Sequence, residues 1–374
     1  MASIQAITMP KWGMTMVEGK LVRWLAAEGA RIATGQEVME VETEKITNVV
    51  ESTVGGTIRR IVVPEGVTAP VGALLAVLAE SDVPDGDVEA FVASYADRAK
   101  ATKDTADAVP APRLVEAGGH RLNVVSLGEG DTVPVVLLHG FGGDGGVWLF
   151  NQDALAAGRP VHIVDLPAHG GSDASVPSGR VDEIATVVIA VLKQLGVTGA
   201  HFVGHSLGGA VALAIAPIEP AQVVSLTLIA PAGIGPDIST DYLDGFLAAD
   251  RRKPMKEVLG KLFAEPETVS AEMVENVLRF KRRDGVSAGL AAVAASLGRD
   301  GRQAVDLRGV LEATTAPVLV IWGERDAIIP VNQSENLPAK IHVERIAEAG
   351  HMPMMEAAGS VNRMIAAHIA AAES

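Results

Sequence analysis

From about residue 115 onward, short apolar runs alternate with stretches whose apolar residues recur every three to four positions. The runs are typical of buried strands, and the longer period is typical of helices that pack on one side. Strands are predicted at Val133–Leu138, Val161–Val164, Ala200–Val203, Val223–Ile229, Val318–Trp322 and His342–Ile346, and helices at Asp182–Leu195, Gly208–Ala216 and Val361–Ala371. This alternation predicts a mostly parallel sheet covered by helices.

The strand pattern stops between residue 235 and about residue 313, where helical stretches take its place. In sheets of this kind, the chemistry gathers beyond the carboxyl ends of the strands. We therefore expect the segment 235–313 to form a cap over the functional site.

The first 80 residues have a different pattern, in which short alternating strands are separated by glycines, and the pattern occurs twice. Glu28-Gly29 aligns with Glu65-Gly66, 37 residues later, and Trp24 aligns with Ile61. The glycines that recur at this spacing are Gly19, Gly29 and Gly35, followed by Gly56, Gly66 and Gly72. Each half is too small to bury its own apolar face, so we predict an all-β sandwich of two sheets with approximate twofold symmetry.

Lys45 lies in the link between these halves, where a hairpin tip is expected. Met9–Gly19, Trp24–Gly29 and Glu42–Lys45 together resemble the lipoyl-domain family over about 80 residues. The resemblance implies that Lys45 carries covalently attached lipoate, a long arm at a rigid tip. The alternative is an ordinary lysine on a solvated turn. The related biotin carriers usually have a methionine on each side, where this chain has a glutamate and an isoleucine.

Residues 81–114 are predicted to link two domains, which gives domain boundaries of 1–80, 81–114 and 115–374. Within the link, Val88, Phe91, Val92 and Tyr95 share one face of a short helix. An alanine- and proline-containing stretch typical of a semi-flexible tether follows. The helix has two interpretations: it docks on a domain or a neighbouring subunit, or it serves as a spacer.

The five residues 204–208, Gly-His-Ser-Leu-Gly, lie between a predicted strand and a predicted helix. A turn this tight needs residues without a Cβ atom on both sides of the serine, and it exposes the serine hydroxyl at the end of a sheet. Ser206 is therefore the candidate nucleophile. The backbone N–H groups of Leu207 and of Phe141, in a glycine-rich loop after Leu138, form the candidate oxyanion hole. For the second loop, an ordinary glycine turn is the alternative.

Two later loops supply candidates for the rest of a catalytic triad. Asp326 and His351 follow Ser206 in the order serine, acid, histidine that an open hydrolase sheet imposes. His351 is the predicted general base, and Asp326 is the acid that orients it. Glu324 is the rival acid, and we prefer Asp326 because its loop continues into Ile328-Ile329-Pro330. Three further histidines are expected to shape the pocket or its loops: His139, His169 and His205.

Together these residues resemble the α/β-hydrolase superfamily over about 250 residues. The predicted fold is therefore multidomain, an all-β lipoyl-type sandwich followed by an α/β-hydrolase fold with a helical cap. Between positions 251 and 283 the cap contains nine basic residues and five acidic ones. Two interpretations are open for Arg251, Arg252, Arg282 and Arg283: a solvated helix face, which we prefer, or contacts with the phosphates of coenzyme A.

Composition narrows the range of partners. The formal net charge of −15 argues against nucleic acid, which requires a basic surface. The chain has no cysteine, so neither disulfides nor thiol chemistry can occur, and we expect no metal. The sequence contains neither a signal-peptide pattern nor an apolar run of membrane-spanning length. We therefore expect a cytoplasmic protein without a membrane partner.

A lipoyl-like segment joined to a serine triad resembles the dihydrolipoyl acetyltransferase components of acetoin dehydrogenase complexes across essentially the whole chain. The resemblance implies that an acetyl group passes from the Lys45 arm to coenzyme A. It also implies a homo-oligomer whose partners are a thiamine-diphosphate-dependent acetoin-cleaving component and a dihydrolipoyl dehydrogenase. Two alternatives stay open: a lipoyl-carrying serine hydrolase, such as a thioesterase or esterase, and a carrier whose triad is vestigial.

Overall fold

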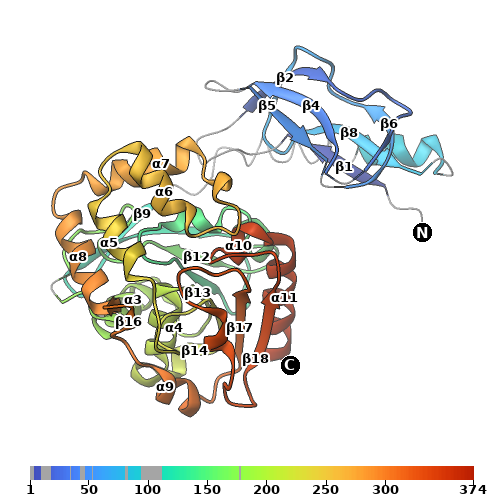
Figure 1. The fold of residues 1–374 in the computed structure, drawn as a ribbon. Coiled ribbons are helices and arrows are strands. Elements are labelled where there is room, and N and C mark those ends of the chain that lie inside the picture. Colours follow the sequence, from blue (N-terminus) through green and yellow to red (C-terminus); the bar gives the residue numbers. More distant parts are fainter. Residues whose placement is uncertain are drawn as a thin grey trace. The chain divides into compact units, whose positions relative to one another are not determined.

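The computed structural model describes residues 4–9, 18–33, 35–42, 47–52, 54–80, 83–93, 112–176 and 178–374. The chain divides into two compact units, Met1–Val109 and Pro110–Ser374 (Figure 1). Our narrower boundaries at residues 80, 114, 235 and 313 stay predictions. Among the described residues, no helix is long and apolar enough to cross a membrane.

The first unit contains two four-stranded sheets, with strand orders β1-β8-β6-β3 and β5-β4-β2-β7. The strands are β1 (Gln5–Thr8), β2 (Glu18–Trp24), β3 (Arg31–Ile32), β4 (Glu37–Glu42), β5 (Thr47–Glu51), β6 (Gly56–Ile61), β7 (Thr68–Pro70) and β8 (Leu74–Ala79). Leu21, Val41, Ile58 and Leu78 belong to one core cluster and are fully buried. The predicted all-β sandwich is therefore confirmed.

The two halves of the sandwich exchange equivalent hydrogen bonds, which confirms the internal repeat. The backbone N–H of Trp24 donates to the Glu65 carboxylate at 2.7 Å, and the N–H of Ile61 donates to Glu28 at 2.6 Å. These two bonds are related by the 37-residue spacing of the repeat. The glycine after each glutamate has a positive φ, 86° in the first half and 81° in the second. A side chain would strain this left-handed conformation, so glycine recurs there.

A helix over residues 85–93 packs on the first unit. Its Val88 is buried in a small apolar cluster with Leu74 and Val77 of β8, and Phe91 and Val92 are partly buried against the same cluster. Of the two interpretations of this helix, docking on a domain is therefore the one observed. Tyr95, predicted on the same face, lies outside the described residues.

The second unit is built on an eight-stranded sheet with strand order β18-β17-β14-β13-β11-β12-β10-β9. The strands are β9 (Arg113–Ala117), β10 (His120–Leu127), β11 (Val135–Leu138), β12 (Val161–Val164), β13 (Ala200–His205), β14 (Val223–Ile229), β17 (Val318–Gly323) and β18 (His342–Ile346). The six strands from β12 to β18 along this order run parallel, and β10 pairs antiparallel with β12 and β9. The predicted mostly parallel sheet is confirmed, and the antiparallel edge is an addition to the prediction.

Helices flank this sheet in two groups (Figure 1). In one group α4 (Leu207–Ile218) contacts α3 (Val181–Gln194) and α9 (Arg308–Ala313), and in the other α11 (Ala358–Ala372) contacts α2 (Gln152–Leu155). The carboxyl ends of the parallel strands lead directly into the loops that contain the candidate site residues. The sheet therefore sets where these residues meet.

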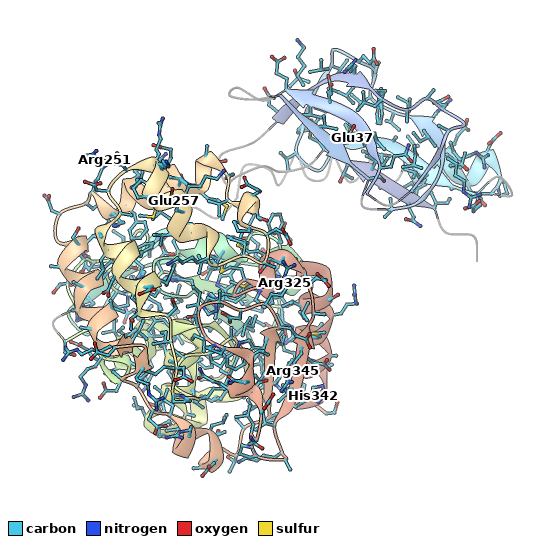
Figure 2. The ribbon with its side chains drawn as sticks, in the orientation of Figure 1. Glu37, Arg251, Glu257, Arg325, His342 and Arg345 are labelled. Carbon is cyan, nitrogen blue, oxygen red and sulfur yellow. The ribbon has the colours of Figure 1, made fainter. Side chains whose placement is uncertain are left out.

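Helices α5 (Thr240–Ala248), α6 (Arg252–Gly260), α7 (Ala271–Lys281) and α8 (Val286–Leu297) contact one another and form the helical cap. Figure 2 shows Arg251 and Glu257 on these helices, with the Arg251 side chain directed outward. A short hairpin follows, made of β15 (Gly298–Arg299) and β16 (Arg302–Gln303). Helix α9 lies within the range 235–313 in sequence, yet it packs on α4.

The turn between β13 and α4 depends on close approaches of backbone to backbone. A Cβ atom added to Gly204 would lie 2.3 Å from the carbonyl oxygen of Gly208, and one added to Gly208 would lie 2.2 Å from that of Leu138. Real Cβ atoms do not approach so near, so both positions must be glycine for α4 to start where it does. The sequence prediction for these two residues rests on the same physical reason.

We expect Gly208→Ala to destabilise the second unit by about 1–3 kcal/mol, because the added methyl group must push α4 away from β11. The measurement is the free energy of unfolding by denaturant. Gly309→Ala is the matched control, since a Cβ added there meets nothing within 4 Å. In helix α9 that change is expected to raise stability by up to about 1 kcal/mol. Equal stability of Gly208→Ala and the unchanged chain would contradict the argument.

Candidate active site

Ser206 occupies a strained backbone conformation at the end of β13. Its φ is 53° and its ψ is −112°, which costs a residue with a side chain about 1–3 kcal/mol. Neighbouring strands hold it there, since the Ser206 N–H donates to the Ile229 carbonyl at 2.9 Å and the Ser206 carbonyl accepts from the Ala232 N–H at 3.1 Å. Strain that the surrounding fold enforces is common at functional positions.

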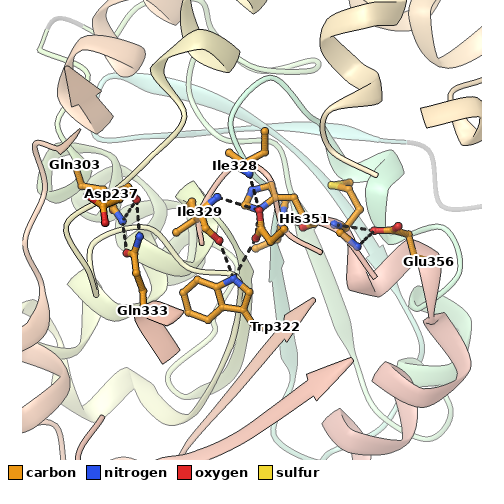
Figure 3. Close-up of polar contacts among 12 residues, drawn as sticks. Asp237, Gln303, Trp322, Ile328, Ile329, Gln333, His351 and Glu356 are labelled. Atoms are coloured by element: carbon orange, nitrogen blue, oxygen red, sulfur yellow. Dashed lines mark hydrogen bonds and ion pairs between the residues drawn. The ribbon is translucent and has the colours of Figure 1, made fainter. Parts of the chain in front are cut away.

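His351 and Asp326 form a buried hydrogen-bonded pair. His351 Nδ1 lies 2.7 Å from Asp326 Oδ2, with side chains 2% and 0% exposed. The second carboxylate oxygen of Asp326 accepts the backbone N–H groups of Ile328 and Ile329, at 2.8 and 2.9 Å. Trp322 Nε1 donates to Oδ2 at 3.1 Å. These donors hold the carboxylate in one orientation, as Figure 3 shows around His351.

Asp326 is the carboxylate that reaches His351, and the rival Glu324 is exposed. The reason lies in β17, which ends at Gly323 and leaves Asp326 to turn inward within its loop. A Cβ atom added to Gly323 would lie 2.0 Å from the Gly350 carbonyl oxygen, so the acid loop and the histidine loop are in direct contact. The geometry thus favours the preferred acid.

His205 brings the serine turn and the histidine loop together. It directly precedes Ser206, and its Nε2 donates to the backbone carbonyl of His351 at 2.8 Å. The two imidazole rings lie 4.7 Å apart between centroids, tilted by 58°. Burial lowers the pKa of His205 well below its ordinary value of 6.5, and the neighbouring His351 contributes to the shift. His205 is therefore a neutral ring with its proton on Nε2.

The glycine-rich loop after β11 lies against the same serine. A Cβ atom added to Gly140 would lie 3.1 Å from Ser206 Cβ and 2.6 Å from His205 Nδ1. Phe141, the next residue, is 6% exposed. Leu207 is the first residue of α4, where no preceding turn of the helix accepts its N–H. The two candidate oxyanion donors thus flank Ser206, one in the adjoining loop and one in the helix.

The cap contacts the glycine-rich loop through aromatic residues. Tyr242 of α5 donates its hydroxyl to the Phe141 carbonyl at 3.3 Å, and the ring of Phe246 packs edge-on against that of Phe141 with centroids 5.3 Å apart. Burial raises the pKa of Tyr242, so its hydroxyl keeps the proton that it donates. Lys281 Nζ lies 4.9 Å from the centroid of the Phe246 ring and donates to backbone carbonyls at the end of α5.

His139 and His169 pack beside this loop as expected for residues that shape it. His139 accepts the Leu166 N–H on Nε2 at 2.9 Å and donates from Nδ1 to the Gly140 carbonyl at 2.8 Å. His169 donates from Nδ1 to the Pro167 carbonyl at 2.9 Å. Burial lowers the pKa of His169 to about 3, so this ring is neutral at physiological pH.

The four cap arginines that are candidates to contact coenzyme A have different surroundings. Arg252 pairs with Glu275, and its hydrogen bond lowers the pKa of that carboxyl, with Arg282 contributing. Arg251 is 85% exposed and lies 3.7 Å from Asp250. Arg283 instead donates to the backbone carbonyls of residues 170 and 172, the second at 3.0 Å. Arg252 and Arg282 thus both act on the carboxyl of Glu275, whereas Arg283 is hydrogen-bonded to a loop of the main domain.

Lys45, the predicted attachment point for lipoate, lies outside the described residues. The strands on each side of its link, β4 and β5, pair antiparallel with Glu42 opposite Thr47. The described part of the sandwich thus fits a lysine presented between two paired strands of a symmetric carrier domain.

Three residues around the site make contacts that the sequence analysis did not anticipate. They are Tyr242, Glu356 and His205, the last through its bond to the His351 carbonyl. Glu356 accepts the N–H groups of Gly350 and Met352 at 2.9 and 3.2 Å. In the sequence, Glu356 is distinguished only by its position soon after His351, and no motif marks that position. Tyr242 belongs to a cap helix whose orientation no motif specifies.

Two family models match the chain. Residues 5–78 match the family described as biotin-requiring enzyme, and residues 133–358 match the family described as alpha/beta hydrolase fold. The second unit also resembles solved structures of that fold. A meta-cleavage product hydrolase from Pseudomonas fluorescens is 20% identical with a TM-score of 0.62, over 70% of this chain and 98% of the other. A carboxylesterase from Bacillus subtilis is 19% identical with a TM-score of 0.60, over 69% and 90%.

Curated relatives match almost the full length. The dihydrolipoyllysine-residue acetyltransferase component of the acetoin cleaving system from Pseudomonas putida is 44% identical over 99% of both chains. Its counterpart from Cupriavidus necator is 39% identical over 98% of both. A 2-hydroxy-6-oxononadienedioate/2-hydroxy-6-oxononatrienedioate hydrolase from Burkholderia vietnamiensis is 34% identical over 67% of this chain and 92% of its own length. The chain therefore belongs to the family of dihydrolipoyllysine-residue acetyltransferase components of acetoin cleaving systems.

Proposed function

We propose that this chain moves an acetyl group from a lipoyl arm on its own Lys45 to coenzyme A, at a site formed by Ser206, Asp326 and His351. The observation that carries the proposal is the union, in one chain, of a lipoyl-type sandwich with a strained serine and a buried histidine–aspartate pair, which His205 links by its bond to the His351 carbonyl. The full-length similarity to acetyltransferase components supports the same assignment.

In this mechanism Ser206 is the nucleophile and His351 is the base. A serine hydroxyl attacks poorly until an imidazole takes its proton, so His351 accepts that proton as the serine oxygen bonds to the thioester carbonyl carbon. Asp326 holds Nδ1–H and stabilises the imidazolium that forms. The N–H groups of Phe141 and Leu207 stabilise the negative carbonyl oxygen.

The intermediate then collapses with loss of the thiol. The carbon–sulfur bond breaks, the leaving sulfur takes the proton from His351, and an acetyl ester remains on Ser206. The thiol of coenzyme A attacks this ester after giving its proton to His351, and the proton returns to Ser206 when acetyl-CoA leaves. The lipoyl group on Lys45, when attached, supplies the thiol that delivers the acetyl group to the site.

The second candidate function is hydrolysis of a thioester or ester at Ser206, because the relative from Burkholderia vietnamiensis is a hydrolase. The two functions differ in the acceptor of the acyl group, a thiol or water. Transfer requires that water be kept from the acyl-serine. In the proposed mechanism this is the role of the cap, which contacts the oxyanion loop through Tyr242 and Phe246.

The specific partners are also part of the proposal. The relatives are components of an acetoin cleaving system, so we propose that this chain works within a multienzyme assembly. A thiamine-diphosphate-dependent component would load the Lys45 arm, a dihydrolipoyl dehydrogenase would reoxidise it, and copies of this chain would form a homo-oligomer.

Ser206→Ala is expected to lower acetyl transfer from free S-acetyldihydrolipoamide to coenzyme A by at least 10³-fold, because it removes the nucleophile. Acetyl-CoA and free acetate are followed together, with and without coenzyme A. Transfer at the normal rate in Ser206→Ala would overturn the mechanism. Acetate as the sole product of the unchanged enzyme would favour the hydrolase instead.

Lys45→Arg is expected to prevent lipoate attachment while preserving the charge. The intact mass of the protein, expressed in a lipoylating host, should therefore lack the increment of a lipoyl amide. Transfer from free S-acetyldihydrolipoamide should be unchanged, because the second unit is intact, whereas turnover that depends on the attached arm should disappear. A lipoylated Lys45→Arg protein would show that another lysine carries the arm.

Arg282→Glu is expected to raise the KM for coenzyme A about tenfold, with kcat nearly unchanged, if this arginine binds a phosphate of the substrate. Arg252→Glu should act similarly because both arginines lie near Glu275. Arg308→Glu is the matched control, since Arg308 begins α9, which packs on α4, and pairs with Asp306 just before that helix. An unchanged KM in both cap variants would leave the solvated helix face as the explanation.

A further inference from the structure

The peptide groups around His351 are all held by hydrogen bonds. The His351 carbonyl accepts from His205 at 2.8 Å, and its N–H donates to the Leu262 carbonyl at 2.8 Å. The N–H groups of Gly350 and Met352, on each side, donate to one oxygen of Glu356. Figure 3 shows Glu356 beside His351, on the side away from the Asp326 loop. The base is thus fixed through its backbone as well as through Asp326.

His205 fixes this loop from the side of the nucleophile. It is 3% exposed, and its Nε2–H must point at the carbonyl because a carbonyl can only accept. Its Nδ1 is buried and has no hydrogen-bond partner among the described residues. That nitrogen faces Gly140, where an added Cβ would lie 2.6 Å away. A single imidazole therefore touches the serine turn, the oxyanion loop and the base loop.

Glu356, at the end of α10 (Pro353–Glu356), fixes the loop from the other side and extends its contacts into the segment after α6. Its second carboxylate oxygen accepts the N–H of Ala264 at 2.8 Å. Arg325, next to the acid, donates to the Ala264 carbonyl at 3.2 Å. A Cβ atom added to Gly350 would lie 2.6 Å from the Ala264 nitrogen, so the two segments are in direct contact.

We propose that His205 and Glu356 are positioning residues for His351, which hold the base loop from opposite sides so that the imidazole stays aligned between Asp326 and Ser206. Both would act through His351 rather than on the reacting atoms. The proposal rests on the proposed role of His351 as the base at Ser206. Proton transfer within a hydrogen bond is efficient only when the donor and acceptor are displaced by well below about 1 Å. A loop held at several peptide groups keeps the His351 imidazole within that range, and a looser loop would not.

The first test replaces His205. His205→Phe keeps an aromatic ring, of larger size, and removes the donor. His205→Gln restores an N–H at nearly the position of Nε2. We expect His205→Phe to lower kcat for acetyl transfer about tenfold with KM unchanged, which corresponds to loss of one buried hydrogen bond. His205→Gln should recover most of that loss. Glutamine has no ring and so resembles histidine in shape less than phenylalanine does. Recovery of activity in His205→Gln would therefore show that the loss in His205→Phe comes from the missing donor and not from a general structural defect.

The second test replaces Glu356, which keeps the proposal testable if His205→Phe fails to fold. Glu356→Gln retains the side-chain length and replaces one acceptor oxygen with a donor that cannot accept the backbone N–H groups. A tenfold lower kcat is expected, again with KM unchanged. Glu348→Gln is the matched control, because it makes the same charge change on the loop that contains His351, at a carboxylate that is 88% exposed. The control should keep full activity.

A fluorophosphonate probe separates failure of this inference from failure of the proposed function. The probe reacts with an activated serine and needs neither the lipoyl arm nor coenzyme A. Slower labelling of Ser206 in His205→Phe and in Glu356→Gln, with normal labelling in Glu348→Gln, supports the proposal. Equal rates in all variants overturn it while leaving Ser206 as the nucleophile. Lack of labelling in the unchanged protein would instead overturn the proposed role of Ser206.

Discussion

The site of this protein depends on close backbone-to-backbone contacts at the start of α4, which leave no room for a Cβ atom. Helix α4 begins directly against the end of β11 because Gly204 and Gly208 have no Cβ atom to intervene. That contact fixes Ser206 in its strained conformation and directs the first turn of α4 at the glycine-rich loop. The acid and the histidine then need only lie on loops at the same edge of the sheet, which parallel strands ensure.

The cap is hydrogen-bonded to two of the catalytic loops. The Leu262 carbonyl accepts the His351 N–H, and the Ala264 N–H donates to the Glu356 carboxylate. Tyr242 donates to the carbonyl of Phe141. Movement of the cap would therefore move both the base and the oxyanion loop. In a transferase, access of the acceptor and alignment of the catalytic groups would then change together, which links exclusion of water to reactivity.

Much of this arrangement follows from sequence because it depends on short-range patterns. Val161–Val164, Val223–Ile229 and His342–Ile346 have the predicted bounds. The first two are mainly apolar and buried, and the third is a partly exposed edge strand. The 37-residue repeat predicted the sandwich, because two similar halves that are each too small to bury their apolar faces can bury them against each other. The role of Tyr242 could not be predicted, because its bond to Phe141 joins segments far apart along the chain. The bonds of Glu356 to Gly350 and Met352 are local but follow no motif, and its bond to Ala264 is again long-range. The antiparallel edge strands were missed because their half-exposed residues form no apolar run.

The reciprocal bonds of the sandwich have a consequence for how that unit folds. One strand end in each half, Trp24 of β2 and Ile61 of β6, donates its N–H to a glutamate of the other half. Neither half can complete its hydrogen bonds alone, so cutting the repeat at its midpoint would leave two fragments that depend on each other for structure. The two halves of the sandwich are therefore expected to unfold together as one cooperative unit.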